Sequence, residues 1–466
     1  MTGEFDRGSF KDPEGRVYIQ DGNVFRTLSG DASRRMRALS ESGVLGQLAA
    51  SGLLIPTRFM AATDAGLDAA TVGESVLQHE RIPLFTYPYE WSFDMLRDGA
   101  LTTLDLLETC LAHDLVLKDA SAYNVAPHRG RMVFFDALSI DRYEDGMPWE
   151  GYAQFCREFV FPLMLTAYRR VEFQHWFRGQ IDGLDLSAFA RLLSWRDCLR
   201  KGVFRHVVLQ AKLERSFAGQ DVKLRGSFKD IKYSKDLIVA NLHGLHKLLR
   251  GLRYRPENSI WIDYAGQSSY SDAAQRTKAD FVVRALRRIA PEQVIDLGCN
   301  TGAYALAAAQ HAARVTAVDN DPACINVLYR RLKESGIENV VPVVNDLLNP
   351  SPALGWNLQQ RRSLLERVRS NAFLALALVH HIRIAGNVPL AAILDLLRNI
   401  APAGVVEWVD KSDGMVARML RNRADVFDDY NWKTFERLLR ERFTLSDVAE
   451  THDGARKLCL LLPREA

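Results

Sequence analysis

The sequence predicts an α/β protein in two parts: an α+β amino-terminal half with a helical lobe, and a carboxyl-terminal half with a parallel sheet. Two observations predict this fold class. From Val294 onward, short apolar strands alternate with helical segments, which is typical of a parallel sheet covered by helices on both faces. Before Pro256, strand-like segments come first and long segments with helical periodicity follow.

The first elements of the chain predict a small β-rich lobe. Residues 16–28 read as two strands around an Asp-Gly-Asn turn. A helix is expected from about Asp31 to Ala50, where Ser51-Gly52 would end it. Strand-like segments follow at residues 53–62 and 76–88.

Beyond Pro88 the pattern becomes helical, with segments starting at Phe93, Tyr152 and Leu186. Between the first two segments lies a loop-and-hairpin stretch, LVLKDASAYNVAPHRGRMVFFD. After this lobe, strands are expected at QVIDLG, ARVTAVD, NVVPVVND, AFLALALV and GVVEWVD, with helices between them. The expected domains are a small β-rich lobe (1–90), a helical lobe with a basic connector (91–255) and the parallel-sheet domain (256–466).

Composition indicates a globular protein of the cytoplasm. Hydrophobic residues make up 47% of the chain, and the polar amino terminus lacks the apolar run of a signal peptide. The most apolar stretch, residues 372–379, is far shorter than the ~20 residues that span a bilayer. The six cysteines contain no CxxC pair, so we expect no metal site and no disulfide framework, as in a reducing compartment.

Basic residues gather between Arg196 and Arg255, although the net charge of the whole chain is only +3. This segment is either a surface for an acidic or nucleic-acid partner, or a set of solvated helix faces near a domain junction. Because no nucleic-acid-binding motif accompanies the charge, we do not expect a nucleic-acid partner.

The segment VIDLGCNTG, residues 294–302, predicts a ligand-binding turn between a strand and a helix. Gly298 and Gly302 let the backbone pass close to a ligand where a side chain would collide. The amino end of the next helix favours a carboxylate. The pattern is DxGxxxG, which differs from the GxGxxG of dinucleotide-binding proteins.

Acidic residues follow the next two strands at positions suited to a nucleoside. Asp319 ends the second strand, 23 residues after Asp296, where it could accept hydrogen bonds from ribose hydroxyls. Asp346 ends the third strand and could receive an adenine amino group. From about Pro256 to its end, the chain thus resembles the class I S-adenosylmethionine (SAM)-dependent methyltransferases. The resemblance implies a Rossmann-like domain with SAM as cofactor, bound by Asp296, Gly298, Asn300, Gly302, Asp319 and Asp346.

Two histidines lie where such enzymes present the methyl group. The segment after the fourth strand reads LALALVHHIRI, not the Asn/Asp-Pro-Pro-Tyr type of motif common in class I enzymes that methylate nucleic-acid or glutamine nitrogen. His380 or His381 is therefore a candidate base for an oxygen acceptor, although both could instead only hold a loop or the acceptor. Upstream, Trp261, Tyr264 and Tyr270 could cover the adenine or face the sulfonium, or could pack a domain junction.

The stretch from His113 to Asp136 is similar to the catalytic loop of kinases. On that resemblance Asp119 would be the base, and Asn124 and Asp136 would be metal ligands. The chain has no lysine between Lys11 and Lys118 and no glycine-rich loop, so Arg26, with Glu41 as its partner, is the nearest substitute for the phosphate-binding lysine. An active kinase, a degenerate nucleotide- or substrate-binding fold and a structural module all remain open.

A closer resemblance spans most of the chain. The segments LKDASAYNV, GMPWEGYAQFCREFVFPL, WIDYAGQSSYSD, LALALVHHIRIAGNVPL and EWVDKSDGMVARMLRNRADVFDDYNWKTFERLL look like those of the two-part, NoeA-like family of bacterial nodulation proteins. This resemblance implies SAM-dependent methyl transfer. We expect O-methylation of a small-molecule or glycan acceptor; the alternatives are a bifunctional protein with a phosphotransfer half, a non-catalytic binding protein and a nucleic-acid methyltransferase.

Overall fold

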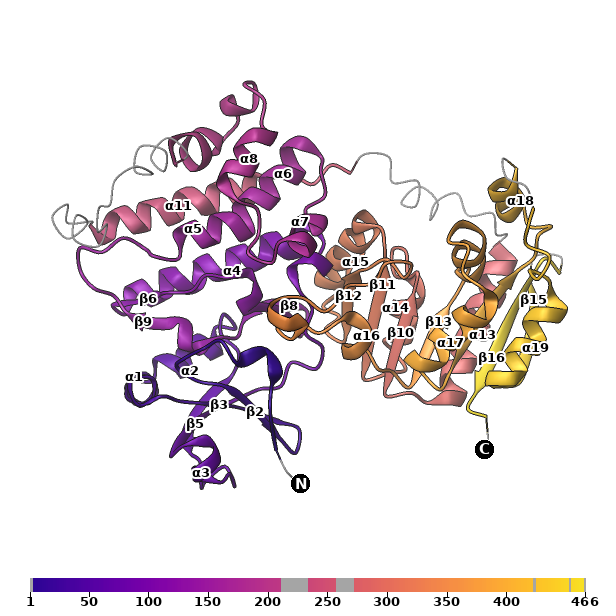
Figure 1. Ribbon diagram of the computed structural model, residues 1–466, viewed down its shortest axis with the longest axis horizontal. Coiled ribbons are helices and arrows are strands. Elements are labelled where there is room, and N and C mark those ends of the chain that lie inside the picture. Colours follow the sequence, from indigo (N-terminus) through magenta and orange to yellow (C-terminus); the bar gives the residue numbers. More distant parts are fainter. Residues whose placement is uncertain (1–2, 211–233, 257–271, 422–424, 452–453, 465–466) are drawn as a thin grey trace. The chain divides into compact units, whose positions relative to one another are not determined.

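The computed structural model divides the chain into two compact units, each with its own sheet (Figure 1). Unit 1 comprises Met1–Glu257 and Ala353–Arg362, and unit 2 comprises Asn258–Pro352 and Ser363–Ala466. The structure describes residues 3–210, 234–256, 272–421, 425–451 and 454–464. The predicted aromatic residues Trp261, Tyr264 and Tyr270 lie outside these described residues.

Unit 1 begins with an antiparallel sheet of five strands among its described residues, in the order β1-β2-β3-β5-β4. The predicted hairpin at residues 16–28 is confirmed, because Asp21 (φ 51°) and Gly22 (φ 81°) turn the chain between paired strands. Positive φ at both central residues matches the twist of the flanking strands. The strands are β1 (Glu4–Phe5), β2 (Val17–Gln20), β3 (Asn23–Thr27), β4 (Thr57–Ala61) and β5 (Ser75–His79).

The helical segment predicted between Asp31 and Ala50 forms two helices, so the prediction of one continuous helix is wrong. Helix α1 (Gly30–Glu41) is capped by the Ser29 side chain, and α2 (Val44–Ala50) follows after a break. The break lies at Gly43, whose φ of 77° is left-handed and cannot continue a right-handed helix. A further short helix, α3 (Ala69–Val72), precedes β5.

The rest of unit 1 is mostly helical and is built around α4 (Phe93–Ala112), most of which is buried. After α4 come two small antiparallel sheets of two strands each within the described chain: β6 (Leu115–Leu117) pairs with β9 (Ile140–Arg142), and the hairpin of β7 (Val125–His128) and β8 (Arg131–Phe134) lies between them in sequence. The remaining helices are α5 (Tyr152–Phe155), a π-helical turn (Cys156–Val160), α6 (Phe161–Arg169), α7 (Gln174–Gly179), α8 (Leu186–Leu192), a second π-helical turn (Phe204–Val208) and α11 (Lys235–Gly251).

Part of the basic segment between Arg196 and Arg255 is engaged inside unit 1. The buried carboxylate of Asp197 pairs with Arg200 at 2.9 Å and with Arg169 at 3.2 Å. The Lys201 ammonium donates to the Lys247 carbonyl oxygen at 3.2 Å. Residues 211–233 of this segment lie outside the described chain.

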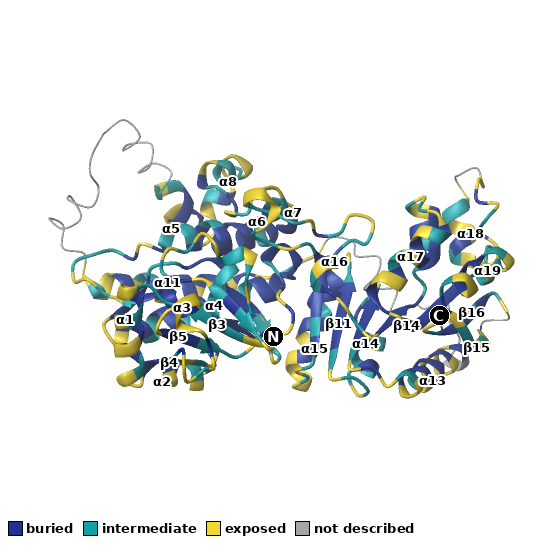
Figure 2. Ribbon diagram, turned by 60° about the horizontal axis from the view of Figure 1, so that its bottom comes forward, coloured by how far each residue is buried: buried dark blue, intermediate teal, exposed yellow. Residues whose placement is uncertain are grey.

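Unit 2 is built on a mostly parallel sheet, which confirms the predicted alternation of strands and helices. Its described strands follow the order β12-β11-β10-β13-β14-β16-β15, with β10 at the switch point where the order reverses. All residues of β13 and β14 are buried (Figure 2), so both faces of the sheet are covered. The parallel strands are β10 (Gln293–Leu297), β11 (Arg314–Asp319), β12 (Val340–Val344), β13 (Ala372–Ala375) and β14 (Ala403–Val409).

Two elements at the carboxyl end of unit 2 were not predicted. Strand β16 (Arg456–Leu462) pairs antiparallel with β14 and with β15 (Thr444–Thr451), at the edge of the sheet. The helices of the unit are α13 (Asp272–Ile289), α14 (Ala303–Ala308), α15 (Pro322–Ser335), α16 (Leu364–Arg367), α17 (Leu390–Ile400), α18 (Gly414–Leu420) and α19 (Trp432–Arg442). Across the described ranges, none of the helices combines the length and the apolarity needed to cross a membrane.

Candidate active site

The predicted ligand-binding turn lies between β10 and α14 of unit 2. Gly298 (φ 76°) and Gly302 (φ 86°) both adopt left-handed conformations that favour glycine. A Cβ atom at Gly302 would lie 2.4 Å from Cδ1 of the buried Leu328, so the turn passes too close to α15 for any side chain. The backbone amides of Gly298 and Cys299 both donate to the Val318 carbonyl oxygen, at 2.9 and 3.0 Å, which fixes the turn against β11.

Asp296 lies on β10 just before this turn, and its carboxyl group is buried. Its Oδ2 atom has no hydrogen-bond partner among the described residues. Burial, together with the negative charge of the nearby Asp319 carboxylate, raises the pKa of Asp296 to about 7 although the Lys278 ammonium opposes the shift. A buried carboxyl oxygen without a partner is costly, so this atom is suited to receive a donor from a ligand.

Asp319 ends β11 and organises the backbone around the turn. Its carboxylate accepts hydrogen bonds from the amides of Asn300 at 2.7 Å and Asp321 at 2.9 Å. Burial raises the pKa of Asp319, and these two amide donors counter that effect. Because β10 and β11 are paired in parallel up to Leu297 and Val318, the structure brings Asp296, the glycine turn and Asp319 together at one edge of the sheet.

Asp346 follows β12, the next strand along, and accepts a hydrogen bond from the Leu348 amide at 2.9 Å. Since β12 pairs in parallel with β11, the carboxyl ends of the two strands share this edge. The edge therefore carries each of the residues that the sequence predicts for the cofactor.

His380 and His381 lie on a helical turn. The fourth strand is shorter than predicted and ends before them. Strand β13 ends at Ala375, and Ala377 (φ 51°) turns the chain into the π-helical segment His381–Ala385. The two imidazole rings lie side by side, with centroids 4.1 Å apart. His380 is buried, and its Nδ1 atom has no hydrogen-bond partner within the described ranges.

Burial lowers the pKa of both histidines. For His380 the shift is large, because the positive charges of Arg456 and Lys278 and the His381 ring add to the effect of burial. For His381 the Arg456 guanidinium adds to burial. Both imidazoles are therefore neutral at pH 7, which is the form that accepts a proton.

Next to the histidines lies a buried ionic cluster that the sequence analysis missed. The Lys278 ammonium on α13 pairs with Glu407 on β14 at 2.6 Å, and Tyr304 lies beneath the same ammonium, with its ring centroid 5.0 Å away. The Arg456 guanidinium lies 3.6 Å from Glu407 and 2.8 Å from Asp413. One residue could have pointed to this cluster in the sequence: Glu407 is an acid inside the otherwise apolar strand GVVEWVD, where a buried charge needs a partner.

We expect Lys278→Met to destabilise the protein by about 3 kcal/mol or more, because it leaves the fully buried Glu407 carboxylate without its closest cation. Lys457→Met is the matched control, since its partner Glu450 is 61% exposed and such surface pairs contribute about 1 kcal/mol or less. Urea unfolding of both variants measures the difference, and equal losses of stability would contradict this account.

The kinase-like residues of unit 1 also come together. Asp136 accepts a hydrogen bond from the Ser139 hydroxyl at 2.7 Å, and the Asn124 amide donates to the same hydroxyl at 3.4 Å. The Arg26 guanidinium lies 3.9 Å from Asp136 and forms a closer ion pair with Asp12. Burial raises the pKa of Asp136; Arg26 opposes the shift, and the negative charge of Asp119 adds to it. Asp119 itself accepts a hydrogen bond from the Ser121 amide at 2.9 Å.

The prediction that Glu41 is the partner of Arg26 is wrong, because Arg26 pairs with Asp12 and lies near Asp136, while Glu41 is exposed at the end of α1. Glu14 instead links two other cations of this region: it pairs with Arg35 of α1 and with Lys118, at 2.6 Å each. Pairs formed with residues 12 and 14 could not be found from strand or helix patterns, because both positions lie in a loop before β2.

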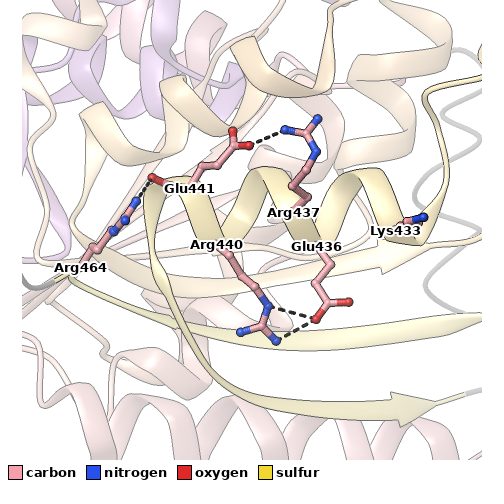
Figure 3. A pocket seen from close by; sticks show the side chains of 6 residues that line it. All are labelled: Lys433, Glu436, Arg437, Arg440, Glu441 and Arg464. Carbon is pink, nitrogen blue, oxygen red and sulfur yellow. Dashed lines mark hydrogen bonds and ion pairs between the residues drawn. The ribbon is translucent and has the colours of Figure 1, made fainter.

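A hollow on the surface of α19 is not part of the site. Figure 3 shows that five of its six side chains lie on α19, where Glu436 pairs with Arg440 at 2.7 Å, and that Arg464, which follows β16, reaches the Glu441 carbonyl oxygen at the end of the helix. Such pairs at i and i+4 stabilise a solvated helix. The hollow is lined by Lys433, Glu436, Arg437, Arg440, Glu441 and Arg464.

The strand order, the glycine turn and the acids at the switch point define a class I SAM-dependent methyltransferase. A family model described as "Methyltransferase domain" matches residues 294–355, which contain these motifs. Nodulation protein NoeA of Rhizobium meliloti (strain 1021) is 35% identical over 437 residues, covering 93% of this chain and 91% of NoeA. The chain belongs to the NoeA family.

Solved structures similar to part of the chain include two methyltransferases. The N-methyltransferase NodS from Bradyrhizobium japonicum WM9, in complex with S-adenosyl-L-homocysteine, is 15% identical, covers 42% of this chain and 90% of its own, and has a TM-score of 0.31. The bifunctional kinase-methyltransferase WbdD is 17% identical, covers 43% of this chain and 41% of its own, and has a TM-score of 0.31. Because these TM-scores are low, the family assignment rests on the sequence identity with NoeA.

Proposed function

We propose that the protein transfers the methyl group of SAM to a hydroxyl oxygen of a small-molecule or glycan acceptor. The observation that carries this proposal is the buried Nδ1 atom of His380, which has no hydrogen-bond partner among the described residues. A neutral imidazole nitrogen in that state can accept the proton that a hydroxyl group loses as its oxygen is methylated. His381, beside it, is the second candidate base.

The residues at the switch point fit the cofactor. Asp296 offers a carboxyl oxygen without a hydrogen-bond partner among the described residues, and Gly298 and Gly302 present backbone without side chains at the two ends of the turn. In this proposal Asp319 accepts hydrogen bonds from the ribose hydroxyls, Asp346 accepts one from the adenine amino group, and Asn300 shapes the turn between them. When bound, SAM supplies an electrophilic methyl group on its sulfonium sulfur. His380 takes the hydroxyl proton, and the buried cluster around Glu407 holds the histidine turn in place.

The chemical bond that holds the transferred methyl group in the product tests whether the acceptor atom is an oxygen. The purified chain is incubated with methyl-labelled SAM and a fractionated bacterial extract, and labelled products are treated with mild alkali and with acid. We expect the label in a small-molecule or glycan fraction, as a methyl ether that survives mild alkali. Label carried by RNA, or by nitrogen after acid hydrolysis, would contradict the proposal.

The affinity for SAM should depend on pH through Asp296. Its pKa in the folded protein is about 7, so the carboxyl group takes up a proton as the pH falls below 7 and loses its attraction for a cationic ligand. Calorimetry should show affinity rising between pH 6 and 8, whereas Asp296→Asn should flatten this dependence. In the free protein the sign for stability is the opposite: because the folded pKa is raised, this group's contribution to stability falls as the pH rises from its ordinary pKa of about 4 to about 7, and it is constant above that. An identical pH profile in Asp296→Asn would exclude Asp296 as the source.

We also propose that unit 1 is a kinase-like module that binds a nucleotide or substrate, with the predicted lobes at 1–90 and 91–255 preceding a methyltransferase domain at 256–466. Its support is the antiparallel sheet followed by a helical lobe, and the cluster of Arg26, Asn124 and Asp136. Mg²⁺-dependent binding of ATP or GTP that weakens at least about tenfold in Asp136→Ala is the expected result. Binding that is absent, or unchanged by the substitution, would remove this proposal.

The setting that we infer is a reducing, cytoplasmic one. All six cysteines are free thiols, and all except Cys198 are buried. Buried thiols without disulfide partners are usual in proteins of reducing compartments.

A further inference from the structure

Two helices of unit 1 bring together metal-ligating side chains that neither the methyl-transfer site nor the kinase-like cluster uses. Helix α4 carries Asp105 and Glu108, and α11 carries His243 and His246. Each pair is spaced i and i+3, so its members lie on one face of their helix. The two helices contact each other, and apolar residues next to these positions, such as Leu107 and Leu245, are buried.

The ligand atoms of three of these residues are close enough to share one ion. One atom each from Asp105, Glu108 and His246 lie within 4.8 Å of one another. The His246 Nε2 atom lies 3.4 Å from Asp105 Oδ1 and 3.8 Å from Glu108 Oε2. His243 Nε2 forms a hydrogen bond with the other oxygen of Glu108, at 2.9 Å.

The state of His246 points to a ligand. The residue is only 9% exposed, and neither ring nitrogen has a hydrogen-bond partner within the described residues. Its Nε2 atom faces two carboxylates at 3.4 and 3.8 Å but does not meet the geometry of a hydrogen bond with either. A buried polar group left in this state costs free energy, which a cation between the nitrogen and the carboxylates would recover.

We propose that Asp105, Glu108 and His246 bind one divalent metal ion of the zinc class. Bonds of roughly 2.0–2.2 Å in a tetrahedron place the donor atoms roughly 3.3–3.6 Å apart, which is close to the separations observed around His246. Nitrogen and carboxylate donors together suit Zn²⁺ better than the hard cations Mg²⁺ and Ca²⁺, which prefer oxygen alone. His243 then acts as an outer partner that orients Glu108, and water takes the fourth position.

The electrostatics of the cluster agree with this assignment. Burial lowers the pKa of His246 although Asp105 and Glu108 oppose the shift, so the imidazole is neutral and able to ligate at pH 7. Burial also raises the pKa of Asp105, and a bound cation would relieve that cost. The cluster does not use unit 2, so the metal site stands independently of the methyl-transfer proposal.

Zinc titration of the full-length protein, in competition with a chromophoric chelator, tests the site. We expect one tightly bound Zn²⁺ per chain in the wild type, and affinity lower by about 100-fold or more in His246→Ala and in Glu108→Gln. Even the loss of an outer partner costs about 10- to 100-fold, so the loss of a ligand should cost at least as much. His175→Ala, an exposed histidine of α7, is the matched control and should bind like the wild type.

Thermal unfolding separates loss of the site from loss of the fold. Glu108 is only half-buried, so Glu108→Gln should fold normally, and zinc should raise the unfolding midpoint of the wild type and of His175→Ala but not that of Glu108→Gln. A wild-type protein that binds no zinc would overturn the proposal. Zinc binding that persists unchanged in both His246→Ala and Glu108→Gln would overturn it equally.

Discussion

Replacing His380 with glutamine is expected to slow methyl transfer by about 100- to 10,000-fold while leaving the affinity for SAM unchanged. The side chain of His380 is buried with an unpartnered Nδ1 atom, and glutamine preserves much of its size and polarity but cannot accept the proton. His381→Gln is the matched control, because its ring lies 4.1 Å away on the same turn. We expect that variant to lose far less activity.

The pH profile distinguishes a base from a residue that only holds the turn. Burial lowers the pKa of His380 well below its ordinary value, so its imidazole stays neutral throughout the neutral range. At saturating SAM, the rate of transfer by the wild type should therefore not fall between pH 8 and pH 6. A rate that falls with a midpoint near 6.5, or a larger loss in His381→Gln than in His380→Gln, would contradict the assignment of His380.

Substituting Gly302 with alanine is expected to destabilise the protein by about 2–5 kcal/mol and to weaken SAM binding. The new Cβ atom would lie 2.4 Å from Leu328 Cδ1 and 3.0 Å from Cδ2, so the buried leucine must move as a whole. Overpacking of this kind costs about 1–3 kcal/mol, and the left-handed φ of 86° adds about 1–2 kcal/mol.

Gly336→Ala is the control that measures only the cost of placing alanine in a left-handed backbone conformation. Gly336 is also left-handed, with a φ of 63°, but a Cβ atom there meets nothing within 4 Å. We expect this variant to lose only about 1–2 kcal/mol and to keep its affinity for SAM. Urea unfolding and calorimetry on both variants make the comparison, and equal losses would show that the contact with Leu328 does not matter.

In unit 2, the sequence predicted which residues gather at the carboxyl ends of the parallel strands better than it predicted the surroundings of the two histidines. Alternating strands and helices place Asp296, Asp319 and Asp346 at the ends of successive parallel strands, and parallel strands end at one edge. The ionic cluster of Lys278, Glu407 and Arg456 joins residues from distant segments of the chain, so only tertiary packing reveals it. The end of β13 was placed four residues too late, because the apolar run AFLALALV continues through a turn at Ala377.

In unit 1, local patterns predicted the hairpin at Asp21 and Gly22 but not the charge pairing. Gly43 breaks a segment that also contains Gly46 within its second helix, so the presence of a glycine inside a helical pattern does not settle where the break falls. The pairing of Arg26 with Asp12, and of Glu14 with Lys118, depends on where a loop is placed by the whole unit. The carboxylates and imidazoles of α4 and α11 meet for the same reason, through helix packing across some 135 residues of chain.

Titration of the protein with SAM by calorimetry, comparing the wild type with Asp319→Ala, tests the central claim most directly. The Asp319 carboxylate holds the amides of Asn300 and Asp321 and in our account accepts the ribose hydroxyls, so its loss should weaken binding about 100-fold or more. Asp395→Ala, which removes an exposed aspartate of α17, should bind SAM as the wild type does. The account predicts one SAM per chain in the wild type and greatly weakened binding in Asp319→Ala; no binding to the wild type, or equal binding to both, would contradict it.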